Sequence, residues 1–173
     1  MAAITFIAPD LRRLENVSAR VLALYRFSDM KPMQGVSSLV DWRLYGHLSR
    51  MVINGFFLGE VGESLLMPLG RHLPQEYLLL FGLGSRENFC EKVFCEDTLR
   101  TFETVRDLGS RNVVLALPGR VENECHSDDA MEWFLECYQE HGDDQDIQII
   151  EPMGAQKAMV PVMERWRLKQ LVP

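Results

Sequence analysis

Short, wholly apolar segments that alternate with segments of helical periodicity constrain the fold of this chain most. Val21–Tyr25 and Tyr77–Phe81 are continuous apolar runs of five residues each. Such runs are typical of strands covered on both faces, because a strand with one wet face alternates polar and apolar residues. The sequence therefore predicts a sheet buried between two layers of helices.

Apolar periodicity and turn residues give the order of the expected elements. Strands are expected at 4–7, 21–25, 63–69, 76–83, 112–117 and 147–150. Helices are expected at about 11–17, 41–55, 88–109, 127–139 and 153–168, with Asp41, Asn88 and Ser127 near their starts as capping residues and a break near Pro161. The short connector at 70–74 predicts an antiparallel hairpin. The expected fold class is α/β: a three-layer α/β/α sandwich with a mixed, mostly parallel sheet.

Length and composition predict one domain. The chain has 173 residues, of which 47% are hydrophobic, which suffices for one sizeable core but not for two ordinary domains. Residues 1–173 are thus expected to form a single domain, with 153–173 as a C-terminal helical extension. No apolar run approaches the roughly 20 residues that cross a bilayer. The N-terminus has no basic region followed by a long apolar one, so a cytoplasmic location is expected.

Charge and cysteine content argue against several partners and cofactors. The 18 basic and 25 acidic residues give a net charge of −7, which repels a nucleic-acid backbone. The four cysteines include no CxxC pair and are expected to be reduced thiols. Cys125, His126, Cys137 and His141 match no common zinc spacing. We therefore predict neither a metal nor another cofactor.

An ordered set of motifs in the middle of the chain resembles a known family. The set comprises Asp41 with the helix ending in Gly55-Phe56-Phe57, the turn Gly59–Glu63, the strand Tyr77–Gly84 and the helix that follows it. It resembles the macro-domain-like N-terminal domain of leucyl aminopeptidases, and the resemblance extends roughly over residues 4–151. It implies a macro-domain-like fold.

The resemblance does not carry the peptidase chemistry with it. In that family the two metal ions and the catalytic lysine and arginine belong to the C-terminal domain, around an Asn-Thr-Asp-Ala-Glu-Gly-Arg motif. This sequence lacks the motif. A two-metal hydrolase also needs several converging carboxylates, and the acidic residues here are scattered. We therefore predict no catalytic residue and expect no enzymatic activity.

Two functions remain open, and the first is association with protein. A non-catalytic, stand-alone relative of this domain would act as an interaction, oligomerisation or regulatory module, with a protein partner or a second copy. The segment Val160–Lys169 combines large apolar groups with arginines, as interface hot spots do. Met163, Trp166 and Arg167 are its predicted interface residues. The aromatic residues elsewhere, including Trp42 and Phe56, are expected mostly in the core.

The alternative is a macro-domain-like binder or hydrolase of ADP-ribose or a related nucleotide. Macro domains hold the diphosphate with a glycine-rich loop and use an asparagine-bearing loop beside it. Here the corresponding loops are 28–35 and 118–123, and they lack the paired asparagines and all but one of the expected glycines. A third loop, 82–86, completes a crevice at the strand ends. The candidate ligand-binding residues are Ser28, Asp29, Gly82, Gly84, Ser85, Gly119 and Arg120.

Overall fold

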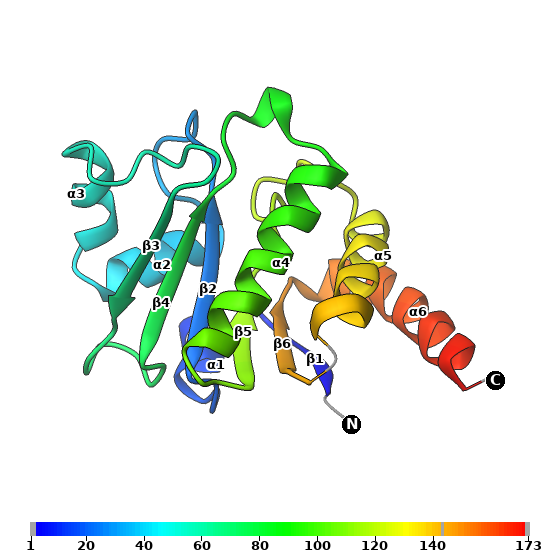
Figure 1. Cartoon of the computed structure of the whole chain (residues 1–173). Helices are drawn as coiled ribbons and strands as arrows, with labels where there is room; N and C mark the ends of the chain where they lie inside the picture. Colours follow the sequence, from blue (N-terminus) through cyan, green and yellow to red (C-terminus); the bar gives the residue numbers. More distant parts are fainter. Residues whose placement is uncertain (1–2, 143, 172–173) are drawn as a thin grey trace.

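Six strands form one mixed sheet in the computed structural model, which describes residues 3–142 and 144–171. The strands are β1 (Ile4–Ile7), β2 (Val21–Arg26), β3 (Ser64–Pro68), β4 (Tyr77–Gly82), β5 (Asn112–Leu115) and β6 (Asp146–Ile150). Their order across the sheet is β1-β6-β5-β2-β4-β3 (Figure 1). Neighbouring strands run parallel except for β3, which pairs with β4 in the predicted antiparallel hairpin.

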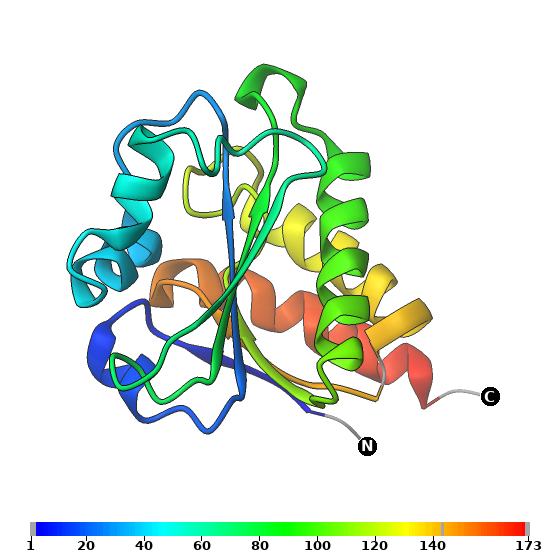
Figure 2. The same cartoon turned by 60° about the vertical axis from the view of Figure 1, so that its left-hand side comes forward.

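Helices cover both faces of this sheet, as Figure 2 shows. One face carries α1 (Leu11–Glu15), α2 (Gly35–Arg43) and α3 (His47–Ile53). The other carries α4 (Glu91–Asp107), α5 (Ser127–Cys137) and α6 (Met153–Gln170). Short turns follow β4 (η1, Arg86–Asn88) and α5 (η2, Tyr138–Gly142). The predicted three-layer α/β/α fold class is confirmed.

The central strand β2 shows why its first five residues, Val21–Tyr25, are all apolar. Ala23 and Tyr25 point into the core shared with α4, α5 and α6, whereas Leu22 and Leu24 belong to the core beneath α1, α2 and α3. Leu22, Ala23 and Leu24 are all fully buried. Alternate side chains of a strand point to opposite faces, so a segment covered on both sides favours apolar residues at successive positions.

The helix predicted to begin at Asp41 is instead two short helices, α2 and α3. The chain turns between them at Tyr45 and Gly46, which have φ angles of 55° and 73°. Asp41 lies inside α2, and its carboxylate accepts hydrogen bonds from the backbone N–H and hydroxyl of Ser49. Asp41 is therefore a capping residue, but it caps the first turn of α3 from the helix before it.

Two other expected capping residues and one expected helix break also differ from the structure. Asn88 lies in η1, where its side-chain amide donates to Ser85 Oγ, and α4 begins three residues later, at Glu91. Ser127 is the first residue of α5, and His126 precedes it as the N-cap. The predicted break at Pro161 is wrong, because α6 continues through it. Pro161 lies on the exposed side of α6, where water can hydrate the carbonyl that the missing N–H leaves free.

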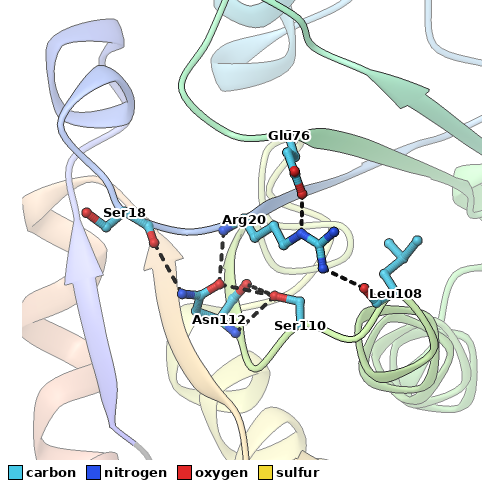
Figure 3. A network of polar contacts seen from close by, with 6 residues as sticks. All are labelled: Ser18, Arg20, Glu76, Leu108, Ser110 and Asn112. Carbon is cyan, nitrogen blue, oxygen red and sulfur yellow. Dashed lines mark hydrogen bonds and ion pairs between the residues drawn. The ribbon is translucent and has the colours of Figure 1, made fainter.

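A polar network fastens the amino-terminal ends of three strands (Figure 3). The Arg20 guanidinium, just before β2, donates to the Glu76 carboxylate before β4 and to the Leu108 carbonyl after α4. Asn112, the first residue of β5, accepts from the Arg20 backbone N–H at 3.0 Å and donates to the Ser18 carbonyl at 3.2 Å. The network thus joins the chain segments at the amino-terminal ends of these strands. The loops that carry the predicted ligand-binding residues lie at the opposite, carboxyl ends of β2, β4 and β5.

Candidate functional site

The predicted ligand-binding residues gather at the carboxyl ends of β2, β4 and β5, which are adjacent in the sheet. The loops after β2 and β4 are joined directly, because the Ser28 N–H donates to the Gly84 carbonyl at 2.8 Å. Ser85 follows, and its hydroxyl accepts from Asn88. Crevices outside the carboxyl ends of parallel strands are the usual ligand sites of such sheets.

The two glycines at the end of β4 serve close packing. A Cβ on Gly82 would lie 2.1 Å from the Glu60 carbonyl oxygen, and one on Gly84 would lie 2.6 Å from a methyl of Val61. Their N–H groups are also engaged, since Gly82 donates to the Glu63 carbonyl and Gly84 to the Gly59 carbonyl. In this structure both amides therefore tie β4 to the 59–63 turn.

The 59–63 turn itself contains an occupied anion cradle. One carboxylate oxygen of Glu63 accepts from the backbone N–H groups of Leu58, Gly59 and Glu60, at 2.9, 2.6 and 2.9 Å. Converging amides of this kind form the anion-binding concavities called nests. Here the chain supplies the anion itself, which fixes the turn against β4.

The loop after β5 is also closed by internal contacts. Gly119 has a φ of 70°, and a Cβ there would lie 2.5 Å from the Phe89 ring. The Arg120 guanidinium forms a buried two-contact ion pair with Glu151 and donates to the Cys125 carbonyl at 2.6 Å. The Arg120 and Glu151 side chains are 8% and 2% exposed. Arg120 thus has a protein carboxylate where an external anion was predicted.

Arg86 links the three loops to one another. Its backbone N–H donates to the Asp29 carboxylate at 3.2 Å, and its guanidinium lies 3.7 Å from that carboxylate. The same guanidinium lies 3.7 Å from the Glu124 carboxylate in the loop after β5. Asp29 is therefore brought to the predicted site, where it contacts a neighbouring loop. The sequence did not single out Arg86 for this role.

Two cavities lie beside these loops. One of about 140 Å³ is lined by Gly35, Val36, Asn123, the Arg120–Glu151 pair and neighbouring residues. The other, of about 310 Å³, lies between the 26–33 segment and α3. The second shares no lining residue with the first, and it is lined by Arg26, Lys31, Pro32, Met33, Ser49, Val52 and Ile53.

Arg26 is a buried cation that the sequence analysis missed. It ends β2, is 3% exposed and donates to the Met30 carbonyl. Burial lowers the pKa of Arg26, while Glu122 attracts it from the loop after β5. Burial in turn raises the pKa of Glu122 to about 7. A signal was available, since an arginine directly after five apolar strand residues has little chance of reaching water.

Exposed apolar side chains concentrate in residues 42–66. Among the described residues, ten large hydrophobic side chains are exposed, and seven of them lie in this segment. Trp42, Tyr45, Ile53 and Phe56 are between 69% and 79% exposed. We call the seven together the 42–66 surface: Trp42, Tyr45, Ile53, Phe56, Leu58, Val61 and Leu66. Leu66 points to the face of β3 opposite α2 and α3, because its neighbours Leu65 and Met67 pack on the side of those helices. The expectation of a core position holds for Phe57, at 2% exposed, and is wrong for Trp42, Tyr45 and Phe56.

The predicted interface residues of α6 mainly contact the domain's own core, η2 and β1. Met163 is 7% exposed and belongs to the core. The Trp166 ring lies 6.1 Å from that of Tyr138, and its N–H donates to Gln139 at 3.3 Å. Arg167 donates to the Ile4 carbonyl at 3.2 Å. Their role at an interface with another molecule stays a prediction.

The described residues contain neither a candidate metal-ligand cluster nor a candidate membrane span. Within residues 3–142 and 144–171, no three His, Cys, Asp or Glu side chains gather in a way that could hold a metal ion. Cys137 is buried and neighbours Cys95, and the pKa of both thiols is raised by burial. No helix in the described part of the chain is long and apolar enough to cross a bilayer.

Solved structures define the class of fold. The Oceanobacillus iheyensis macrodomain with ADP superposes with a TM-score of 0.74 at 12% identity, covering 95% of this chain and 91% of that one. A mutant tomato leucine aminopeptidase superposes with a TM-score of 0.63 at 14% identity, covering 94% of this chain and 36% of that one. At these identities the likeness concerns the fold, which is that of a macrodomain.

Sequence comparison gives the narrower relation. No protein-family profile matches the chain. A stretch of 79 residues is 37% identical to a probable cytosol aminopeptidase of Thermosynechococcus vestitus, covering 46% of this chain and 16% of that protein. A similar stretch of 72 residues is 36% identical to the Nitrosomonas europaea counterpart, covering 42% and 14%. The matches thus span about one sixth of those relatives, and the predicted resemblance to the N-terminal region of leucyl aminopeptidases is confirmed.

Proposed function

We propose that this domain is a protein-interaction module that self-associates through the 42–66 surface. The observation that supports the proposal is the concentration of seven of the ten exposed large hydrophobic side chains of the described residues in one short segment. Scattered exposed apolar residues are ordinary, whereas a gathering of aromatic and aliphatic groups is typical of interaction sites.

The arrangement of elements favours a second copy as the partner. The segment runs through α2, α3 and β3, which lie together at one side of the domain (Figure 1). β3 is an edge strand, so no strand of the described residues pairs with its outer side. Two copies related by a twofold axis would bury the same apolar surface on each, and twofold dimers are the commonest oligomers.

Sedimentation velocity over about a hundredfold range of concentration tests the proposal. The wild type is expected to show a concentration-dependent mass, and Trp42→Ser/Phe56→Ser should remain monomeric. Met153→Ser/Leu168→Ser, which changes exposed apolar residues of α6, is the matched control and should associate like the wild type. A wild type that stays monomeric throughout contradicts self-association. Loss of association only in the control variant would show that the interface lies on α6 and not on the 42–66 surface.

A second candidate function is nucleotide binding in the 140 Å³ cavity. It is favoured by the macrodomains with ADP of Oceanobacillus iheyensis and Trypanosoma brucei, which share this fold with TM-scores of 0.74 and 0.69. The engaged amides of Gly82 and Gly84 and the Arg120–Glu151 pair count against it. Calorimetry with ADP and ADP-ribose is the test. Saturable binding that is lost in Val36→Trp, which would fill the cavity, supports this second function, and no heat with either compound contradicts it.

A further inference from the structure

The 310 Å³ cavity between the 26–33 segment and α3 combines two cations with an apolar wall. Arg26 and Lys31 supply the charges, and Pro32, Met33, Val52 and Ile53 supply apolar lining. Neither cation forms an ion pair with any residue of 3–142 or 144–171, whereas the protein as a whole carries a net charge of −7. Positive charge is therefore concentrated where the rest of the chain is acidic.

Arg26 is the more unusual of the two cations. Its side chain is almost wholly buried, yet its Nε has no hydrogen-bond partner among the described residues. One terminal nitrogen donates to the Met30 carbonyl, and the other has only the Met33 sulfur at 3.9 Å. A thioether is a weak acceptor. A buried charge with so little compensation is costly to folding, and such groups gather at functional sites.

The charges near Arg26 do not replace the missing partner. Glu122 attracts Arg26 but lies beyond ion-pair distance, and burial raises the pKa of Glu122 to about 7. The Ser49 hydroxyl, also on the cavity wall, donates to the Asp41 carboxylate. Asp41 is thus engaged in capping α3. The guanidinium retains donors for an acceptor that residues 3–142 and 144–171 do not provide.

We propose that this cavity binds a small amphipathic anion, with a carboxylate or phosphate head against Arg26 and Lys31 and an apolar group against Met33, Val52 and Ile53. An anionic oxygen takes the place of the Met33 sulfur, which the flexible methionine side chain allows. The cavity volume suits a small ligand. This site is separate from the 140 Å³ cavity, and it shares Ile53 with the 42–66 surface.

Calorimetry on the whole chain with four probes tests the proposal. Octanoate and phenyl phosphate carry both required features, whereas octanol lacks the charge and inorganic phosphate lacks the apolar group. At least one amphipathic anion is expected to bind saturably, about tenfold or more tighter than octanol and inorganic phosphate, because charge-assisted hydrogen bonds and apolar burial must act together. The preference between octanoate and phenyl phosphate identifies the head group.

Variants locate the binding. Lys31→Glu reverses the charge of an exposed residue at the cavity and should weaken binding at least about tenfold. Lys157→Glu makes the same change on an exposed residue of α6 and should leave it unaltered. Arg26→Met should abolish binding while raising the unfolding temperature of the unliganded chain, because it removes a poorly compensated buried charge. The proposal is overturned if neither amphipathic anion binds up to about 10 mM, or if Lys31→Glu and Lys157→Glu bind equally well.

Discussion

Arg120 and Glu151 join the loop after β5 to the residue that follows β6 through two hydrogen bonds of 3.0 and 3.3 Å. The pair lies almost entirely out of water. Burial raises the pKa of Glu151, and Arg120 opposes this shift. The carboxyl ends of β5 and β6 are thereby held together by a buried interaction in which Arg120 and Glu151 compensate each other's charge, and Arg120 also donates to the Cys125 carbonyl.

Removing one member of this pair should be far more damaging than removing both. Arg120→Met leaves Glu151 buried without its cation, and Glu151→Leu leaves the guanidinium without its anion, so each should cost about 3–5 kcal/mol of unfolding free energy. The double variant should lie within about 1.5 kcal/mol of the wild type. Urea unfolding of all four proteins gives the coupling free energy. Small, additive effects would show that the two charges do not depend on each other.

Gly82 should tolerate no side chain. The Cβ of Gly82→Ala would overlap backbone atoms of the 59–63 turn, which cannot move without breaking the Glu63 cradle, so a loss of about 3 kcal/mol or more is expected. Gly154→Ala in α6 is the control, since no atom lies within 4 Å of its added Cβ. It should be neutral or stabilise by about 0.5 kcal/mol. Equal melting temperatures for the two variants would contradict this account of Gly82.

Asp41 should stabilise α3 rather than α2. Asp41→Ala removes both acceptors of Ser49 and should cost about 1–2 kcal/mol. Ser49→Ala removes only the hydroxyl bond and should cost less. Amide hydrogen exchange locates the effect, which should appear as faster exchange in His47–Ile53 with little change in the first turns of α2. Faster exchange confined to α2 would contradict the assignment.

The sequence predicted the sheet and its layers because a strand buried on both faces appears in the sequence as a continuous apolar run. The central strands β2, β4 and β5 contain apolar runs, and turn residues mark the ends of the strands, so the strand positions and the β3–β4 hairpin could be predicted. Helix starts were less predictable. The Asp41 side chain acts eight residues along the chain, and a capping residue that acts on a later helix cannot be distinguished by local pattern from one that begins its own.

The candidate site was only partly predictable for a related reason. The sequence indicated that the loops after β2, β4 and β5 lie close together, because parallel strands place their carboxyl ends at one edge of the sheet. Whether an amide or a guanidinium is free depends on contacts between distant segments. Arg120 pairs with Glu151, 31 residues away, and Gly84 donates to Gly59, 25 residues earlier. The exposure of Trp42 and Phe56 likewise depends on which elements cover α2 and α3, which composition does not encode.

Glu122 should make stability fall as the pH rises through the weakly acidic range. Its pKa is raised from 4.5 to about 7, first by burial and further by Glu124, while Arg26 and Arg86 oppose the shift. The folded chain therefore holds this proton more tightly than the unfolded chain. Folding is unaffected by Glu122 below about pH 4.5 and is increasingly disfavoured between that pH and about 7.

Glu122→Gln should remove this contribution. The variant is expected to match the wild type near pH 4 and to unfold at a higher temperature at pH 8, by an amount that the lost attraction to Arg26 reduces. Part of the fall in unfolding temperature with rising pH should remain in Glu122→Gln, because burial also raises the pKa of Asp97 to about 6. Glu164→Gln removes one exposed negative charge on α6 and should give a curve parallel to that of the wild type. Thermal unfolding from pH 4 to 8 measures all three proteins, and a Glu122→Gln curve parallel to the wild type would show that this carboxyl is not the source of the slope.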